Sequence, residues 1–294
     1  MSIKKGIYAA SMTVINKDLS VNIDSTIEHS ERLIQQGCHG VVIGGSTGMS
    51  QLISPNEKRK LIDKMSVSKF KDNFVFGTGA NSMNENVQLM KHCIGNGINK
   101  FLIMPSAYYK YNDDGAYSFY ANIIERVPES EIILYNFSKL SGYSFSIKII
   151  EKLVKDFQKQ IVGIKDSDYQ IFDKLKIPNF MIFPGSETKL LKGLELGCSG
   201  IISAICNVTA PLARKVFDDF IDKKKQTFNE RLCAIRKVFD KYNLISGLHT
   251  FLSFEHEKYN IVLPPLSLLS KEEEKQLMTD LKTLDFFPQK NIAA

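Results

Sequence analysis

The sequence contains no tryptophan and only five cysteines, and each shortage narrows what the protein can be. The cysteine count is odd and no two cysteines form CxxC, so neither a disulfide framework nor a cysteine zinc site is indicated. The five histidines form no HExxH or other close metal-binding pair. Without tryptophan, the chain lacks a residue often used as a binding anchor. Free thiols are typical of a reducing compartment, so we expect a cytoplasmic protein.

Long hydrophobic runs and a strong charge imbalance are missing too. No apolar run reaches the ~18 residues that span a bilayer, and Met1–Gly6 lacks the apolar segment of a signal peptide. The 294 residues include 38 Lys+Arg against 32 Asp+Glu, a formal charge of +6 with no dense basic patch. We therefore expect a soluble protein that binds neither a membrane nor a nucleic acid.

Eight short apolar runs recur along the chain, and their centres lie 19 to 33 residues apart. Their nearly continuous apolar character is typical of strands buried on both faces of a parallel sheet. A strand–helix–strand unit takes about 30 residues, so the spacing leaves room for a helix after each strand. The runs are Gly6–Val14, Gly40–Ile43, Asn73–Thr78, Lys100–Met104, Glu131–Tyr135, Gln160–Lys165, Phe180–Pro184 and Gly200–Ser203.

Helical patterns fill the gaps between these runs. Ser54–Glu57 combines a capping box with a proline at the first helical position. Apolar stripes within 23–34 and Pro211–Ile221 suit one helix face each. The alternation predicts the α/β class and a (β/α)8 TIM barrel. A doubly wound open sheet with a second domain is the alternative, but no break in composition favours it.

The chain after Lys223 is helix-like throughout, with apolar stripes at Phe228–Phe239 and Leu277–Leu284. A plain barrel takes about 250 residues, so these helices account for the extra length. We predict a barrel over residues 1–222 and a C-terminal helical extension, packed on the barrel, over residues 223–294.

Barrel enzymes carry their functional side chains at the C-terminal ends of the strands. Lys165 stands out there, because it directly follows the apolar Ile161–Ile164. A buried lysine loses its ammonium charge more readily, and the neutral amine can form a Schiff base with a carbonyl substrate. In the alternative interpretation, Lys165 extends to solvent and pairs with Asp166.

Other strand ends are polar as well. Tyr135 is either a core tyrosine or a proton shuttle in the same cavity. The turn Gly44–Gly48 offers backbone N–H groups and hydroxyls that can hold a carboxylate or phosphate, although it lacks the pattern of a P-loop or dinucleotide site. Taken alone, it is equally a simple turn. Tyr108 and Tyr109 suit a functional loop, a packing role or an oligomer interface.

Taken together, the strand ends resemble the dihydrodipicolinate synthase / N-acetylneuraminate lyase family of class I aldolases. The resemblance extends from about Lys5 to the C-terminal helices. It is carried by an ordered set of segments at the family's spacing, namely Gly44–Gly48, Gly77–Ala80, Tyr135–Asn136, Gly163–Asp166 and Gly185–Glu187.

The resemblance implies catalytic roles for several residues. Lys165 falls on the lysine that condenses with the ketone of pyruvate or another 2-oxo acid, and Tyr135 falls on the tyrosine that moves protons. Thr47 or its neighbour Ser46 joins the proton relay. Tyr109 falls near the loop tyrosine that completes this relay, often across a subunit interface, and Tyr108 competes for that role.

The resemblance also implies a substrate site and an assembly. Ser46 and Thr47 grip the 2-oxo acid carboxylate beside Gly45, and the backbone of Ile202 faces the pyruvyl group. Ser167 falls where lyases contact the sugar with a hydroxyl residue, and Glu187 falls on an acidic residue of the substrate-binding site. Members of the family are typically homotetramers, arranged as dimers of dimers, and use no metal or organic cofactor.

Two departures separate the branches of the family. Leu140 occupies the position where dihydrodipicolinate synthases have an arginine for the semialdehyde carboxylate, and Lys139 cannot make the same planar contact. Thr188 follows Glu187 where sialic-acid lyases carry a second acid, which argues against sialic acid itself. The pattern is closer to the lyase and 2-keto-3-deoxy sugar-acid aldolase branches.

The expected function is therefore reversible cleavage or formation of a 2-oxo acid from pyruvate and a sugar-derived aldehyde. A 2-keto-3-deoxy sugar acid or an N-acetylneuraminate-like compound fits this description. The alternatives are 4-hydroxy-tetrahydrodipicolinate synthase, a 2-oxo acid dehydratase of the same family, and a non-catalytic sensor of 2-oxo acids. The presence of both Lys165 and Tyr135 argues against the sensor.

Overall fold

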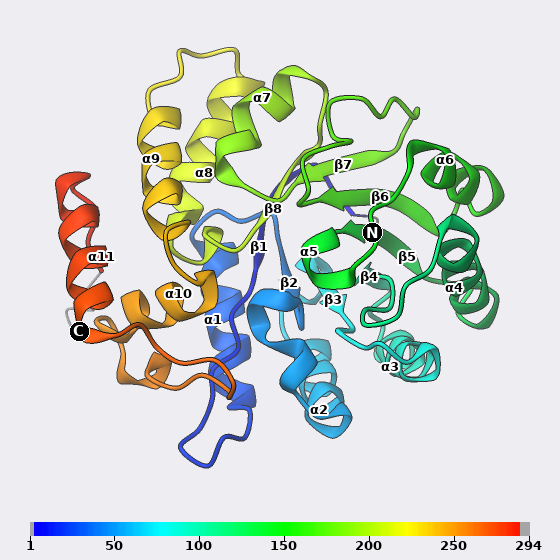
Figure 1. The fold of residues 1–294 in the computed structure, drawn as a ribbon, viewed down its shortest axis with the longest axis horizontal. Coiled ribbons are helices and arrows are strands. Elements are labelled where there is room, and N and C mark those ends of the chain that lie inside the picture. The colour runs from blue at the N-terminus through cyan, green and yellow to red at the C-terminus, as the bar shows by residue number, and fades with distance from the viewer. Residues whose placement is uncertain (1–2, 289–294) are drawn as a thin grey trace.

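The structure, a computed structural model, describes residues 3–288 and forms a (β/α)8 TIM barrel with C-terminal helices (Figure 1). Within these residues eight parallel strands run in the order β7-β6-β5-β4-β3-β2-β1-β8. Ser199 N donates to Ile182 O at 2.8 Å and links the two outermost strands, so the barrel is nearly closed. The strands are β1 (Gly6–Ala10), β2 (Gly40–Ile43), β3 (Phe74–Gly77), β4 (Lys100–Ile103), β5 (Glu131–Asn136), β6 (Ile161–Asp166), β7 (Met181–Pro184) and β8 (Gly200–Ser203).

Helices surround the barrel and alternate with most of its strands (Figure 1). The capping box predicted at Ser54 is confirmed, because Glu57 N donates to the Ser54 side chain and Ser54 N donates to Glu57. The helices of this layer are α1 (Ile23–Gln35), α2 (Pro55–Ser66), α3 (Met83–Gly95), α4 (Asp113–Arg126), α5 (Ser138–Ser141), α6 (Ile147–Asp156), α7 (Leu190–Glu195) and α8 (Cys206–Ile221).

The first strand is shorter than the sequence predicts. We expected it to continue to Val14, but β1 ends at Ala10. Met12 N donates to Asn207 Oδ1 at 3.1 Å, and Val14 N donates to Thr26 Oγ1 at 3.0 Å, so these backbone groups leave the sheet. The Met12 and Val14 side chains are buried in a cluster with the C-terminal helices. An apolar run therefore marks burial here but not strand pairing.

The C-terminal helices α9 (Asn229–Phe239), α10 (Leu244–Ser253) and α11 (Lys271–Thr283) lie together on one side of the barrel (Figure 1). Their apolar side chains, such as Phe239 and Leu277, pack with Met12 and Val14 of the barrel. The prediction of helix throughout is wrong over residues 260–270, which the structure describes without helix. Pro264 and Pro265 lie in this stretch and lack the N–H that a helix needs. The boundary after residue 222 stays a prediction, and residues 289–294 of the predicted extension lie outside the described residues.

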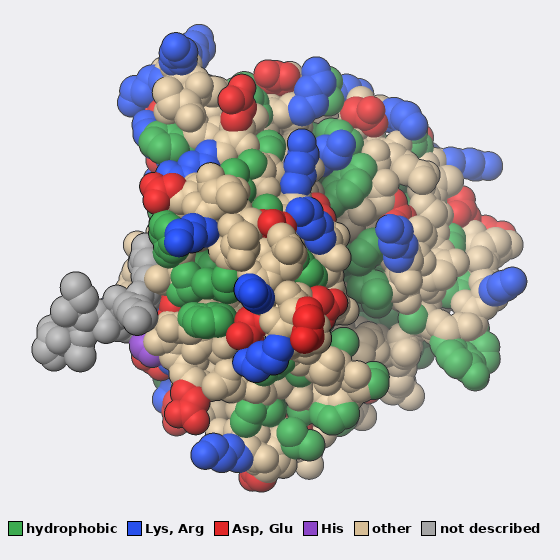
Figure 2. All heavy atoms as spheres, turned by 60° about the vertical axis from the view of Figure 1, so that its left-hand side comes forward, with side chains coloured by type: hydrophobic (Ala, Val, Ile, Leu, Met, Phe, Trp, Pro, Cys, Tyr) green, Lys and Arg blue, Asp and Glu red, His purple; other side chains and the backbone are tan. Residues whose placement is uncertain are grey.

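Charged side chains of both signs are interspersed on the face that Figure 2 shows, where the side of α9 and α11 comes forward. Lysines and arginines do not gather into one patch on this face. No helix within residues 3–288 is long and apolar enough to cross a membrane.

Candidate active site

A cavity of about 240 Å³ opens among the C-terminal ends of the strands and the loops that follow them. Five residues singled out from the sequence line it, and they come from three different strand ends. Parallel strands of a barrel bring these distant segments to one edge, as we predicted. The five residues are Ser46, Thr47, Tyr135, Lys165 and Ser167.

Lys165 and Tyr135 lie side by side in this cavity. Lys165 of β6 is the register partner of Tyr135 of β5, and Lys165 Nζ lies 4.3 Å from the centroid of the Tyr135 ring. The Lys165 side chain is only 6% exposed. Among the described residues, no group forms a hydrogen bond or ion pair with Lys165 Nζ or the Tyr135 hydroxyl, and neither atom is sealed from solvent. Both groups are therefore available to a ligand.

Asp166, the next residue, is used differently. Its carboxylate is fully buried and accepts a hydrogen bond from Asn136 Nδ2 at 2.9 Å. Successive side chains of a strand point to opposite faces, so Asp166 points away from the cavity that Lys165 enters. The alternative in which Lys165 pairs with Asp166 is wrong. Backbone N–H groups of the following loop complete the shell of this carboxylate, from Asp168, Tyr169, Ile171 and Phe172 at 3.0 to 3.2 Å.

The glycine-rich turn after β2 presents Ser46 and Thr47 to the cavity from a short 3-10 helix, η1 (Ser46–Gly48). Gly44 has a φ of 76°, and a Cβ there would lie 2.5 Å from Gly77 O, so the turn requires glycine. Thr13 Oγ1 donates to Gly48 O at 2.7 Å and holds the far end of the turn. Gly45 lines a small adjoining cavity that shares Ser46 and Tyr135 with the main one.

The loop tyrosines lie outside the described lining of the cavity. Tyr108 is 89% exposed and Tyr109 is 76% exposed. Their rings contact each other edge to face, with the two ring centroids 5.1 Å apart. Tyr108 has a φ of 84°, in the left-handed region that a bulky residue seldom adopts. In the single chain both rings are exposed, and the relay role of Tyr109 stays a prediction.

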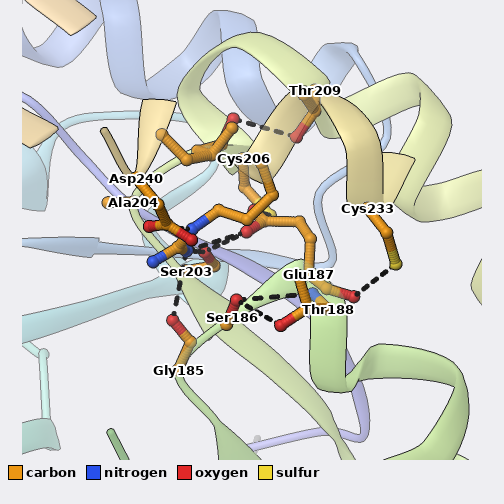
Figure 3. A network of polar contacts seen from close by, with 12 residues as sticks. Gly185, Ser186, Glu187, Thr188, Ser203, Ala204, Cys206, Thr209, Cys233 and Asp240 are labelled. Carbon is orange, nitrogen blue, oxygen red and sulfur yellow. Dashed lines mark hydrogen bonds and ion pairs between the residues drawn. The ribbon is translucent and has the colours of Figure 1, made fainter. Parts of the chain in front are cut away.

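Glu187 and Ile202 are fully buried and also lie outside the described lining of the cavity. Ile202 packs in the barrel interior with Tyr135. Figure 3 shows Glu187 among Ser203 and Cys206, and Ser203 Oγ donates to Glu187 Oε2 at 2.7 Å. Arg236 Nη1 donates to the same oxygen at 3.0 Å. The substrate contacts of Glu187 and Ile202 stay predictions.

The contribution of the C-terminal helices to the cavity is not predicted from the sequence. Arg236 of α9 and Asn243, Leu244 and Ile245 at the start of α10 are among its lining residues. One signal was present, because Arg236 interrupts the buried stripe of Leu232, Ile235 and Phe239 on α9. A charged residue on the apolar face of a helix requires a buried partner.

We also searched the described residues for a metal site. Within residues 3–288, no group of three or more His, Cys, Asp or Glu side chains is arranged to hold a metal ion.

The fold and the cavity define a barrel protein with a lysine and a tyrosine at adjoining strand ends. The chain belongs to the dihydrodipicolinate synthetase family, whose model matches residues 4–284. It is 28% identical to a 4-hydroxy-tetrahydrodipicolinate synthase of Methanococcoides burtonii, over 95% of this chain and 98% of the relative. It is 27% identical to an N-acetylneuraminate lyase of Clostridium perfringens, over 73% and 75%.

Two further comparisons agree with this assignment. An uncharacterized DapA-like lyase of Chloroflexus aurantiacus is 27% identical over 93% of this chain and 94% of the relative. The crystal structure of YagE, a prophage protein of the dihydrodipicolinic acid synthase family from E. coli K12 in complex with pyruvate, superposes with a TM-score of 0.88. That pair is 20% identical and covers 97% of this chain and all of YagE, so it supports the fold. At the level of the family, the chain is an aldolase-lyase.

Proposed function

We propose that the protein is a class I aldolase that reversibly cleaves a 2-oxo acid into pyruvate and a sugar-derived aldehyde through a Schiff base on Lys165. One observation carries the proposal. The Lys165 amine lies in a cavity 4.3 Å from the centroid of the Tyr135 ring and has no hydrogen-bond or ion-pair partner among the described residues. The pyruvate bound to YagE, a structural neighbour, supports pyruvate as the ketone.

The chemistry follows from the side chains of the cavity. The Lys165 amine attacks the C2 carbonyl of the 2-oxo acid, and loss of water gives a protonated imine. The imine nitrogen accepts the electron pair of the C3–C4 bond, so the aldehyde leaves as the C4 hydroxyl loses its proton. Protonation of the resulting enamine at C3 and hydrolysis release pyruvate and the free lysine. Tyr135, beside the amine, exchanges protons in these steps, while Ser46 and Thr47 hold the carboxylate.

The first experiment tests the imine. The protein is incubated with pyruvate, reduced with borohydride and digested, and the modified residue is identified by mass spectrometry. We expect the adduct on Lys165, and a Lys165→Met variant should show none. An unmodified Lys165 at saturating pyruvate would contradict the proposal.

A screen of aldehydes with pyruvate tests the reaction. Leu140 lines the cavity at the position where the resemblance implies an arginine in synthases, which binds the semialdehyde carboxylate. We therefore expect sugar aldehydes to react and aspartate semialdehyde not to react. The reverse result would favour 4-hydroxy-tetrahydrodipicolinate synthase, the name of several relatives. Loss of water from the sugar acid without release of pyruvate would favour the dehydratase.

We also propose a homotetramer in which Tyr109 completes the site of a neighbouring subunit. The exposure of both loop tyrosines in the single chain supports this proposal. Analytical ultracentrifugation gives the assembly. Tyr109→Phe should lower kcat with the oligomer intact, and an equal effect of Tyr108→Phe alone would reassign the role.

A further inference from the structure

Part of the cavity wall comes from outside the barrel strands and their loops. Arg236 of α9 lines the cavity that holds Lys165, together with Asn243 at the start of α10. The C-terminal helices therefore contribute a cation to a site whose other cationic lining residue, within the described chain, is Lys165. A guanidinium that lines this cavity can donate hydrogen bonds to a bound molecule.

Two of the three guanidinium nitrogens of Arg236 are already used. Nε donates to Asp240 Oδ1 at 2.8 Å, and Nη1 donates to Glu187 Oε2 at 3.0 Å. Nη1 also donates to Ser203 Oγ at 3.1 Å. Figure 3 shows Asp240, Ser203 and Glu187 gathered in this network. These contacts fix the planar group in one orientation.

The third nitrogen, Nη2, has no hydrogen-bond acceptor among the described residues. It is also not sealed from solvent, in contrast to Nε of Arg32. Since the Arg236 side chain is otherwise buried and lines the cavity, its free N–H groups are available to a molecule bound there. The network thus leaves one fixed donor for a ligand.

The surrounding charges indicate which kind of acceptor fits. Burial lowers the pKa of Arg236, but Glu187 and Asp240 outweigh burial and raise that pKa above its ordinary value, so the group stays cationic. These two carboxylates already neutralise the single positive charge. A third carboxylate would meet their repulsion at short range, whereas a neutral hydroxyl oxygen would not.

We propose that Arg236 is a specificity-determining residue whose Nη2 donates a hydrogen bond to a hydroxyl oxygen of the aldehyde half of the substrate. This inference rests on the aldolase function proposed above, because it assigns the part of the substrate that Lys165 does not hold. It places selection for a hydroxylated, uncharged aldehyde on a residue of the C-terminal helices. Lys165, Ser46 and Thr47 hold the pyruvyl half.

Arg236→Lys tests the proposal, since lysine keeps the charge beside Glu187 but has no planar fork. Initial rates are measured for pyruvate with glyceraldehyde and erythrose, and with propanal, which lacks hydroxyls. We expect kcat/KM for the hydroxylated aldehydes to fall by about 10- to 100-fold, mainly through KM. The value for propanal should stay within about twofold. Arg231→Lys is the matched control, because Arg231 lies on the same helix and donates to Leu284 O and Asp285 O instead.

Borohydride trapping of pyruvate separates this inference from the proposed function. An adduct on Lys165 in both wild type and Arg236→Lys, with an unchanged preference for hydroxylated aldehydes, would overturn the role of Arg236 alone. Failure to trap pyruvate in either protein would overturn the aldolase function. An equal loss for propanal and glyceraldehyde would show a structural role only and would also overturn the inference.

Two further measurements keep the test decisive if Arg236→Lys does not fold. The double variant Arg236→Gln/Glu187→Gln removes both charges of the buried pair and should show the same loss of preference. Wild type itself should use glyceraldehyde better than succinate semialdehyde. A preference for the anionic aldehyde would overturn the assignment of a neutral acceptor.

Discussion

Lys165 and Asp166 are consecutive residues of β6, both nearly free of contact with bulk solvent, and the structure treats them in opposite ways. The carboxylate accepts five hydrogen bonds from described residues and is fully used. The amine accepts and donates none among those residues and faces a cavity. Glu187, which is not among the lining residues, resembles Asp166, because its carboxylate accepts hydrogen bonds from Ser203 and Arg236. Buried polar groups with saturated contacts stabilise the fold, and those left without partners are available for chemistry.

Lys165→Met gives the largest expected effect and tests the first half of this comparison. Removal of the nucleophile should lower kcat/KM by at least about 10⁴-fold. Stability should change by less than about 1 kcal/mol, since no hydrogen bond is lost. Steady-state rates and urea unfolding measure the two quantities. Lys64→Met, a change at an exposed lysine of α2, is the control for both. A large loss of stability with retained activity would reverse the roles assigned here.

Asp166→Ala tests the second half. Four backbone N–H groups of the loop after β6 would lose their acceptor, so we expect a loss of about 3–5 kcal/mol in the free energy of unfolding. Asp166→Asn keeps one carbonyl acceptor and should lose less. Urea unfolding at pH 7 measures both variants. If Asp166→Ala is as stable as wild type, the carboxylate does not hold the loop.

His29 of α1 is a third buried polar residue, and it makes the stability of the fold depend on pH. His29 is fully buried between Tyr259 and Asn207, and burial lowers its pKa to about 3. The unfolded chain takes up this proton below pH ~6.5 and the folded chain does not, so stability falls as pH drops from ~6.5 towards 3. At pH 5 the expected loss is ~2 kcal/mol relative to pH 7.

Urea unfolding of wild type and His29→Gln at pH 7 and pH 5 measures this effect. The variant should be less stable than wild type at pH 7, and its further loss at pH 5 should be smaller by ~2 kcal/mol. His249, whose pKa burial lowers to about 4, remains in both proteins and contributes equally. Parallel losses in the two proteins would show that His29 titrates alike in the folded and unfolded chains.

Ser167→Ala gives the smallest expected change in stability. Ser167 lines the cavity, and its hydroxyl has no hydrogen bond to a described residue. We expect a change below about 0.5 kcal/mol in the free energy of unfolding, with a raised KM for the hydroxylated aldehyde. Calorimetry and initial rates check the two effects. A loss as large as that of Asp166→Ala would place Ser167 among the structural groups.

The sequence predicts the barrel and much of the cavity because both follow local patterns. Apolar runs place the strands, and the residues just after them, such as Lys165 and Tyr135, meet at one edge by the geometry of the fold. Arg236 could not be assigned in this way, because its partner Glu187 is 49 residues away and α9 carries other basic residues that look alike in sequence. The early end of β1 has the same origin, since Met12 packs against helices far along the chain.

One irregularity of β6 has a genetic consequence. Between β5 and β6 the register shifts, so that Ile132 pairs with Ile161 but Ile133 pairs with Gly163, and Val162 is the extra residue. Deletion of Val162 would leave this pairing regular, because Ile161 and Ile164 already share the outer face with their partners Ile132 and Leu134. Deletion of Ile164, a paired residue, would instead turn the residues after it to the opposite face. If the shift fell on Lys165 and Asp166, a carboxylate would enter the cavity and the amine would enter the wall. The loss of the single codon for Ile164 should therefore exchange a nucleophile for an acid in the cavity, while the loss of the codon for Val162 should not.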